Sequence, residues 1–469
     1  MSGAGIKRRD FIKGAGAAAI GLATGAGSSL ASQKSPNIIY ILLDDAGYGD
    51  FSCYGQERYE TPHIDRIASS GMRFTDHYAG STVCAPSRCC LLTGKHTGHS
   101  YVRGNKSADA EEGQMPLPED TVTFSRLLQE AGYVTGAFGK WGLGPPGSSG
   151  DPLNQGFDEF FGYNCQSLAH NYYPDHLWHN REKVELDGET YSHDLIMKQA
   201  MEFIKQNHDR RFFCYLPVTI PHASLHVPEE SAAPFRKKFR MFELVPGFYD
   251  GPVVRNPAAC FAGMMTRLDR QVGEIMQLVS RLGIDDNTIV MITSDNGPHL
   301  EGGAMPWFFN SNGPFKGHKR DLYEGGIRVP MIARWPGQIP AGTVSDHVGA
   351  FWDVMPTVCD IAGIRKPDGI DGISMLPALR KDEASQKEHH HLYWEFHELG
   401  GRQAVRSGKW KAVRYSVSFD RDKGVELYDL EKDKAEKNDV ADKHPEEARR
   451  MLELMRGSRT VSKHFKLFR

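Results

Sequence analysis

The stretch Asn37-Ile38-Ile39-Tyr40-Ile41-Leu42-Leu43-Asp44-Asp45-Ala46-Gly47 decides the fold class of this chain. A short, almost wholly apolar run ends abruptly in two adjacent aspartates. Such a run predicts a strand that is buried on both faces of a parallel sheet. Ligands of open α/β sheets bind at the carboxyl ends of the strands. The two carboxylates therefore indicate either a bound cation or a solvated turn at that edge.

A second apolar run, Thr288 to Thr293, repeats the pattern and ends in Ser294-Asp295-Asn296. If both strands lie near each other in one parallel sheet, four oxygen-bearing side chains meet at one edge: Asp44, Asp45, Asp295 and Asn296. Oxygen ligands of this kind suit Ca²⁺ or Mg²⁺. The sequence therefore predicts one divalent cation site, without choosing between the two ions.

Between these strands lies Val83-Cys84-Ala85-Pro86-Ser87-Arg88-Cys89-Cys90-Leu91-Leu92-Thr93-Gly94. Pro86 suits the first turn of a helix, so Cys84 is expected just outside a helix N-terminus, where negative charge is favoured. Arg88, one turn along, would supply a fixed cation to the same place. On this stretch alone, a buried free cysteine before an ordinary helix is an equal alternative.

Two more predicted strands are followed by ionisable residues, and a third is preceded by one. Residues 133–138 lead to Lys140, residues 212–219 lead to His222, and Lys319 precedes a strand at residues 327–333. Strands alternate with helical patterns, which is typical of an α/β fold with a large mixed, mostly parallel sheet flanked by helices. We expect this larger domain over residues 36–378. The predicted strands then become short, and charged residues become more frequent. This change predicts a smaller C-terminal α+β domain over residues 379–469, with a short antiparallel sheet and a terminal helix.

Composition narrows the classes of function. Of 469 residues, 40% are hydrophobic and 25% are charged, as in ordinary soluble globular proteins. The net charge of −3 gives no electrostatic footprint for nucleic acid. The eight cysteines form no CxxC pair, which argues against a zinc ribbon or a thioredoxin-type motif and leaves disulfides open.

The N-terminus predicts export. Lys7-Arg8-Arg9-Asp10-Phe11-Ile12-Lys13 is a twin-arginine pattern, and Ser29-Leu30-Ala31 offers the small residues of a cleavage site. The apolar stretch between them is too short and too rich in glycine for a transmembrane helix. We expect residues 1–31 to be a twin-arginine signal peptide read by the Tat translocase. The protein would then be an exported bacterial protein, periplasmic or extracellular.

The motif Cys84-x-Pro86-Ser87-Arg88, followed by Leu91-Leu92-Thr93-Gly94, resembles the signature of the formylglycine-dependent sulfatases of the alkaline phosphatase superfamily. The resemblance extends over nearly the whole mature chain. It implies an alkaline-phosphatase-like fold and hydrolysis of aryl or carbohydrate sulfate esters to an alcohol and sulfate. In that family a formylglycine-generating or an anaerobic sulfatase-maturating enzyme oxidises the cysteine to formylglycine, whose hydrate is the nucleophile.

The resemblance also implies roles for individual residues. Asp44, Asp45, Asp295 and Asn296 would bind Ca²⁺ or Mg²⁺ together with the modified Cys84. Arg88 would steady the hydrate, and Lys140 would contact both the nucleophile and the sulfate. His222 would hydrogen-bond the ester oxygen and protonate the leaving group, and Lys319 would bind sulfate oxygens.

Gly142 departs from the family pattern. Most members have a histidine there, two residues after the lysine, that helps to collapse the sulfated hydrate. Either another histidine replaces it or the step is handled differently. His99 is the first candidate, because its loop follows the helix that starts beside Cys84. His299, three residues beyond Asn296, is the second, and His96 is the third.

Ring-rich segments suggest a sulfated carbohydrate as the substrate. The candidate substrate contacts are His170, Tyr172, Tyr173, Trp394 and His397. The composition of residues 166–178 is equally compatible with a packed surface loop that binds no ligand. Two other functions are compatible with parts of the pattern. One is a phosphodiester or phosphonate monoester hydrolase of the same superfamily, and the other is an exported glycan-binding protein in which Cys84 stays unmodified.

Overall fold

The computed structural model describes residues 35–108 and 112–468. The signal-peptide motifs lie outside the described residues, so export stays a prediction. No helix in the described ranges has the length and apolar character that a bilayer crossing needs.

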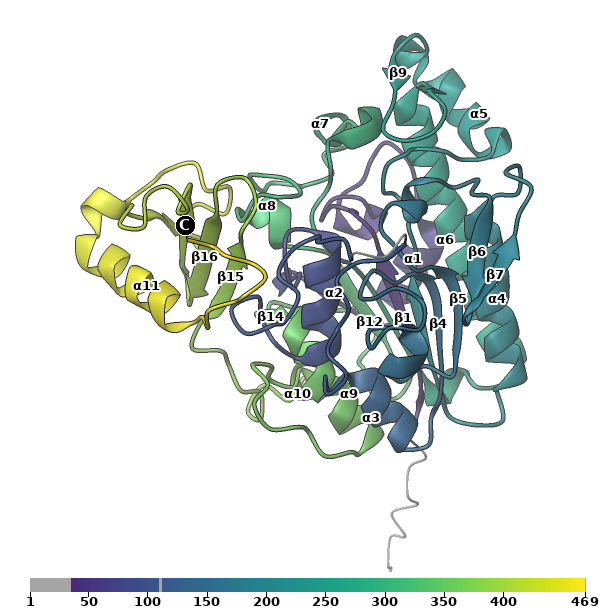
Figure 1. Ribbon diagram of the computed structural model, residues 1–469, viewed down its shortest axis with the longest axis horizontal. Helices are drawn as coiled ribbons and strands as arrows, with labels where there is room; N and C mark the ends of the chain where they lie inside the picture. The colour runs from purple at the N-terminus through teal and green to yellow at the C-terminus, as the bar shows by residue number, and fades with distance from the viewer. Residues whose placement is uncertain (1–34, 109–111, 469) are drawn as a thin grey trace, which may run out of the picture. The chain divides into compact units, whose positions relative to one another are not determined.

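A mixed, mostly parallel ten-stranded sheet forms the centre of the catalytic region (Figure 1). Its strand order is β13-β2-β12-β11-β1-β8-β4-β5-β6-β7. Strand β1 pairs in parallel with β11 on one side and with β8 on the other, and β4 pairs in parallel with β8 and β5. The strands of this sheet are β1 (Asn37–Leu43), β2 (Met72–Phe74), β4 (Val134–Lys140), β5 (Glu159–Tyr163), β6 (His176–His179), β7 (Glu182–Glu185), β8 (Phe212–Pro217), β11 (Thr288–Ser294), β12 (Met331–Arg334) and β13 (Thr343–Ser345).

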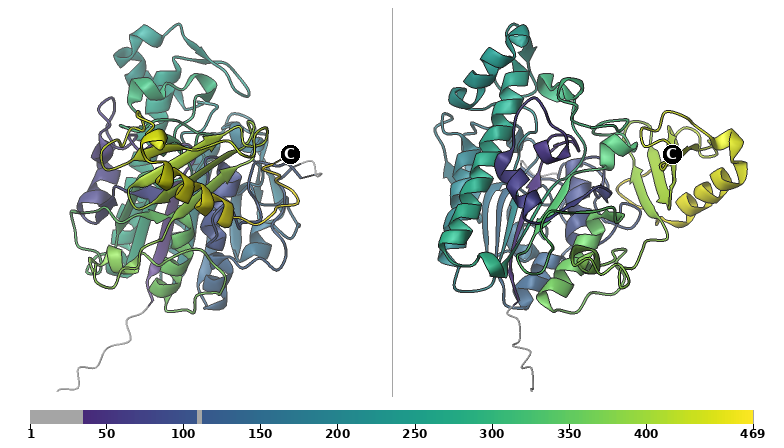
Figure 2. Two further views of the ribbon diagram at one scale, coloured as in Figure 1. Left: turned by 90° about the vertical axis from the view of Figure 1, so that its left-hand side faces the viewer. Right: turned by 180° about the vertical axis from the view of Figure 1, so that it is seen from behind.

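Helices cover both faces of the sheet, as the apolar run of β1 predicts. Ile39 and Ile41 pack in a core that includes residues of α4 (Ser192–Gln206) and α6 (Pro257–Arg281). The alternate residues, such as Tyr40, pack in a second core with α2, α3 and α9. Figures 1 and 2 show these two helical layers on either side of the strands. The helices of the second layer are α2 (Cys84–Thr93), α3 (Phe124–Glu130) and α9 (Val354–Ala362).

The remaining helices and strands are short or peripheral. They are α1 (Pro62–Ser69), α5 (Glu229–Lys238), α7 (Pro306–Phe309), α8 (Glu324–Ile327) and α10 (Leu376–Leu379), with the strand pairs β3 (His77–Tyr78) with β14 (Gly349–Ala350) and β9 (Pro246–Gly247) with β10 (Val254–Arg255).

A separate four-stranded antiparallel sheet lies in the C-terminal region, with the helix α11 (Pro445–Gly457) on one of its faces (Figure 2). The other face packs against Tyr78, Val83 and Trp352 of the catalytic region. Residues 35–469 form one compact unit, so the predicted domain boundary near residue 379 stays a prediction. The strands of this small sheet are β15 (Leu392–Phe396), β16 (Arg402–Ser407), β17 (Trp410–Tyr415) and β18 (Glu426–Asp429).

Some predicted boundaries differ from those observed. The strand expected at residues 327–333 begins only at Met331, because Pro330 has no N–H to donate to the sheet. The loop expected at residues 166–178 contains a short 3₁₀ turn at Leu168–His170 and the start of β6.

Candidate active site

The ends of β1 and β11 bring the four predicted oxygen ligands together. The two strands are in parallel register, with Leu43 opposite Ser294, so the residues that follow them meet at one edge. The N–H of Asp45 donates to Asp295 Oδ1 at 3.2 Å, and Asn296 Nδ2 donates to Asp45 Oδ1 at 2.7 Å. Asp44 is fully buried beside them.

These residues fit a hard divalent cation. Asn296 Oδ1 is buried and has no hydrogen-bond donor among the described residues, so an acceptor oxygen is left for another partner. Burial and the negative charge of Asp44 raise the pKa of Asp295 to about 7, because several carboxylates crowd one water-excluded place. A cation there would favour the ionised form of that carboxylate. The donor set of carboxylate and amide oxygens is the one that Ca²⁺ and Mg²⁺ prefer.

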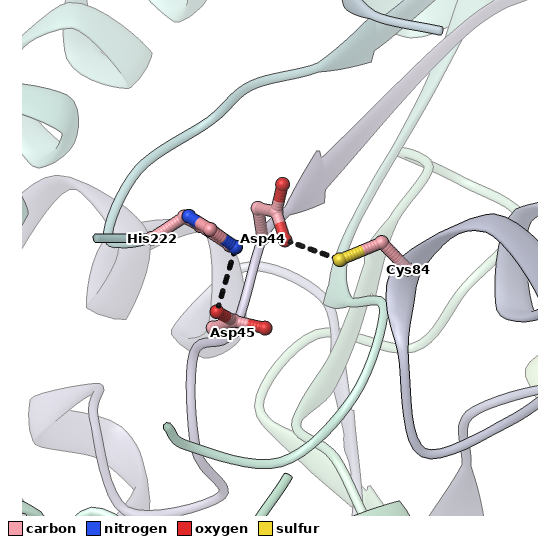
Figure 3. Close-up of side chains that lie close together, drawn as sticks. All are labelled: Asp44, Asp45, Cys84 and His222. Carbon is pink, nitrogen blue, oxygen red and sulfur yellow. Dashed lines mark hydrogen bonds and ion pairs between the residues drawn. The ribbon is translucent and has the colours of Figure 1, made fainter. Parts of the chain in front are cut away.

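Cys84 is the first residue of α2 rather than lying just before it, with Val83 at the N-cap position. Its Sγ is 3.1 Å from Asp44 Oδ1 and 3.6 Å from Lys140 Nζ, which places it directly beside the carboxylate cluster (Figure 3). Burial and the charge of Asp44 raise the pKa of the thiol well above its usual value. The free thiol is therefore protonated at neutral pH and is a poor nucleophile as it stands.

Buried cations surround the cysteine. Lys140, the last residue of β4, places Nζ 2.6 Å from Asp44 Oδ2. Arg88 lies one helical turn after Cys84, and its Nη2 is 2.8 Å from Asp295 Oδ2 and 3.3 Å from Asp44 Oδ2. Lys319 places Nζ 2.7 Å from Asp45 Oδ2. The positive charges needed to hold an anion are thus fixed around one point.

His222 completes the cluster from the loop that follows β8. Its Nε2 accepts a hydrogen bond from Lys319 Nζ at 3.1 Å and is 3.5 Å from Asp45 Oδ2, while Nδ1 contacts the carbonyl of Ala223. Figure 3 shows its ring pointing toward Asp45. Burial, followed by the charges of Lys319 and Lys140, holds the pKa of His222 well below its usual value. The imidazole is therefore neutral in this arrangement.

The structure also shows what occupies the place of the missing histidine. Gly142 has φ of +81°, and a Cβ built on it would lie 2.3 Å from Nε2 of Gln166. The Gln166 carboxamide thus fills the space that a side chain at position 142 would enter. Its Nε2 is buried and has no partner in the described part of the chain.

Two of the three predicted replacement histidines lie elsewhere. His99 Nδ1 is 2.9 Å from Asp371 Oδ1, and His96 stacks on His99 and packs against Tyr393 of the C-terminal sheet. No contact joins either ring to Cys84, Lys140 or His222 in the described ranges. His299 does reach the site, since its ring lies 5.9 Å from that of His222. However, its Nε2 is already 3.1 Å from the carbonyl of Pro221, and its Nδ1 faces Glu301.

Only some of the predicted substrate contacts lie at the site, as with the predicted replacement histidines. His170 stacks on His222 with ring centroids 4.8 Å apart. Tyr172 is fully buried, and its hydroxyl donates to the carbonyls of Thr219 and His222, so it supports the His222 loop rather than facing a substrate. Tyr173 packs against Tyr191 and His226.

Trp394 and His397 belong to the C-terminal region. Trp394 is fully buried, and its indole N–H donates to the carbonyl of Ala79, which leaves no surface for a ligand. His397 packs against Phe396 and Phe465. The packing of the small sheet on the catalytic region buries Trp394, whereas His397 stays partly exposed. Sequence reasoning missed Tyr249, whose ring touches both His170 and His222. No local motif marks it.

Comparison with known proteins decides the family. The family model described as Sulfatase matches residues 36–364. The chain belongs to the sulfatase family. A second model, described as N-sulphoglucosamine sulphohydrolase, C-terminal, matches residues 315–458. The sulfatase chain is therefore a sulfuric ester hydrolase with an alkaline-phosphatase-like fold.

Similar proteins include several carbohydrate sulfatases. The N-acetylgalactosamine-6-sulfatase of Canis lupus familiaris is 36% identical over 76% of this chain and 68% of its own length. The N-acetylgalactosamine-6-O-sulfatase of Bacteroides thetaiotaomicron is 31% identical over 92% of this chain and 94% of its own length. The solved structure of Ps i-CgsB in complex with k-i-k-neocarrahexaose has a TM-score of 0.77 and 30% identity, and covers 90% of this chain and 92% of that one.

Proposed function

We propose that this sulfatase removes sulfate from a sulfated carbohydrate, with Cys84 converted to formylglycine and one Ca²⁺ or Mg²⁺ bound beside it. The observation that carries the proposal is the position of Cys84. Its side chain lies against Asp44 and Lys140 inside the buried cluster of carboxylates and cations. An ordinary buried cysteine needs no such surroundings.

Two groups would complete this site. Asp44, Asp45, Asp295 and Asn296 would hold the divalent ion, which would supply positive charge for a sulfate oxygen. Formylglycine at position 84 would supply, as its hydrate, an oxygen nucleophile in place of a thiol that burial keeps protonated.

The side chains of this chain would perform the remaining tasks. Lys140 and Lys319 would bind the anionic sulfate, and Arg88 would hold position 84 and the metal carboxylates in place. His222 would give a proton to the departing alcohol oxygen. Its ring is neutral beside Lys319, and a bound sulfate would add the negative charge that favours the protonated, donating form.

The carbohydrate substrate is proposed from the relatives. Proteins that are 31% and 36% identical are named for sulfated N-acetylgalactosamine, and the similar Ps i-CgsB structure contains a carrageenan oligosaccharide. A phosphonate monoester hydrolase of Agrobacterium radiobacter shares the fold at 20% identity, which says nothing of the substrate. Comparing turnover of an aryl sulfate and an aryl phosphodiester separates the two reactions.

Export and maturation belong to the same proposal. The twin-arginine pattern at residues 7–13 supports passage through the Tat translocase into the periplasm or beyond. A formylglycine-generating or an anaerobic sulfatase-maturating enzyme would act on the Cys84-x-Pro86-Ser87-Arg88 segment before α2 buries it, because Cys84 is 1% exposed in the folded chain.

Mass spectrometry of the Cys84 peptide tests the proposal. Enzyme purified from a host with its maturation partner should carry formylglycine at position 84, and Cys84→Ala should abolish turnover of an aryl sulfate. Enzyme that is fully active while its Cys84 peptide retains an unmodified thiol would overturn the assignment. Thermal unfolding of Cys84→Ala, expected to be close to that of the parent protein, serves as the folding control.

A further inference from the structure

Two partly exposed rings, those of His170 and Tyr249, pack against the buried ring of His222. The side chain of His222 is 3% exposed, and Cys84 and Lys140 are also buried. His170 stacks face to face on His222, with the two planes at 2°. Tyr249 meets both histidines edge-on, with centroids 5.0 Å from His170 and 5.9 Å from His222. Of the rings that contact His222, those of His170 and Tyr249 are therefore more exposed than that of His299.

One serine holds these rings in place. Ser224 lies two residues after His222, and its N–H donates to the carbonyl of His170 at 3.2 Å. Its Oγ accepts a hydrogen bond from the N–H of Asp250 at 2.9 Å and also contacts the carbonyl of Asp250. Asp250 follows Tyr249 in the segment between β9 and β10. The His222 loop and the segments that carry His170 and Tyr249 are thus linked through the backbone N–H and the side-chain hydroxyl of Ser224.

The chemistry of the pair suits a sugar. No group in the described ranges hydrogen-bonds the ring nitrogens of His170 or the hydroxyl of Tyr249. Burial and the charges of Lys140 and Lys319 lower the pKa of His170 to about 3, so its neutral ring offers one donor and one acceptor. Tyr249 adds an apolar ring with a polar end. Apolar faces combined with a few hydrogen-bonding groups are typical of small-molecule sites.

We propose that Tyr249 and His170 bind the sugar ring that carries the sulfate, on the leaving-group side of His222. The inference rests on the proposed function, because it takes the sulfate to lie among Lys140, Lys319 and the cation ligands. With the sulfate there and its ester oxygen toward His222, the sugar continues toward the two partly exposed rings. Position 249 is then a determinant of sugar specificity.

Binding to enzyme that cannot turn over tests this inference. In full-length Cys84→Ala protein with Ca²⁺, calorimetry should show tighter binding of N-acetylgalactosamine 6-sulfate than of inorganic sulfate. Adding Tyr249→Ala should weaken binding of the sugar sulfate about tenfold and leave inorganic sulfate unchanged. Tyr249→Phe should keep most of the affinity, because the ring remains. Tyr101→Ala is a matched control, since Tyr101 is another partly exposed tyrosine beside a histidine, His464.

The outcomes separate the two hypotheses. If the Cys84→Ala protein, without a further substitution, does not bind inorganic sulfate, the proposed function fails. The inference is overturned, while the proposed function stands, if the Cys84→Ala protein binds inorganic sulfate without preferring the sugar sulfate. The same holds if adding Tyr249→Ala leaves the full preference for the sugar sulfate. Should Tyr249→Ala lower the melting temperature, Tyr249→Leu and His170→Asn repeat the test with smaller changes in volume.

Discussion

At the scale of single residues, the site is a set of buried charges that neutralise one another. Asp44 is fully buried, yet the cations around it, Lys140 first, hold its pKa well below the usual range despite the burial that opposes ionisation. Each of these lysine and arginine side chains is therefore fixed by a carboxylate before any substrate arrives. Such preorganised charge is usually the largest single contribution to catalysis.

Replacing Lys140 with methionine should reveal this contribution. We expect kcat/KM for an aryl sulfate to fall on the order of 10²–10³-fold, because one fixed cation at the sulfate is lost. The melting temperature should also fall, since Asp44 loses its partner at 2.6 Å. Lys205→Met is the matched control, because Lys205 forms only an exposed pair with Glu202 on α4. Unchanged kcat/KM in Lys140→Met would contradict the assigned role.

The histidines outside the site should have little effect. His99→Ala should turn over an aryl sulfate within about twofold of the parent enzyme, because His99 contacts Asp371 and His96 rather than the cysteine cluster. Rapid mixing of His99→Ala and His96→Ala should show no burst of phenol. A burst followed by a slow phase, the sign that a general acid–base group was removed, would restore that histidine as the substitute for the one missing at Gly142.

At the scale of secondary-structure elements, the chemistry lies where strands end. Strands β1, β11, β4 and β8 lie in one sheet, and each either ends in a polar or charged residue of the cluster or leads into the loop that carries one. The segment before α8 adds Lys319, whose N–H donates to the carbonyl of Pro298 in the loop after Asn296. The loop after β11 and the loop that carries Lys319 are thus joined by a backbone hydrogen bond.

Removal of the cation should destabilise these strand ends. Treatment with a chelator should abolish activity and lower the melting temperature, and Ca²⁺ or Mg²⁺ should restore both. A free cation concentration of 100 times its dissociation constant raises the free energy of unfolding by about 2.7 kcal/mol. Asn296→Leu should require more metal for the same shift, because the unpartnered Oδ1 is lost. Full activity and an unchanged melting temperature in metal-free enzyme would show that the site assignment is wrong.

At the scale of the whole described unit, the C-terminal sheet supports the active-site loops from outside. Lys411 of β17 is fully buried, and its Nζ is 2.7 Å from Glu324 Oε1, five residues after Lys319. Tyr78 and Arg328 hydrogen-bond the other oxygen of Glu324. The small sheet therefore fixes the loop that carries Lys319, although none of its strands supplies a residue to the cysteine cluster.

Stability should depend on Glu324 in a defined range of pH. Burial opposes its ionisation, but Lys411 and Arg328 lower the pKa of Glu324 to about 2, below the value of about 4.3 in an unfolded chain. Its contribution to folding is thus complete above about pH 4.3 and is lost as the pH falls toward 2. The difference in unfolding free energy between the parent and Glu324→Gln should shrink over that range. A difference that stays constant from pH 6 to pH 2.5 would contradict the ionic role.

The sequence by itself determined the α/β class, the oxygen-bearing residues at two strand ends and the resemblance to the sulfatase family. These features are local: a buried parallel strand is a continuous apolar run, and the polar residues that follow it mark the edge of the sheet. The strand register then confirmed that Asp44, Asp45, Asp295 and Asn296 meet. The signal peptide and the place of export stay predictions, because residues 1–34 are not described.

Only the tertiary structure decided what lies around the cluster. Trp394 was a candidate substrate contact, but it is buried against Tyr78 and Trp352. His99 is expected near Cys84 from its position in the sequence, but it contacts Asp371 instead. Gln166 fills the space at Gly142, and Tyr249 reaches His222 from a hairpin that carries no motif. These contacts join segments far apart in the chain, and their side-chain directions depend on packing, for which a linear sequence has no periodic signal.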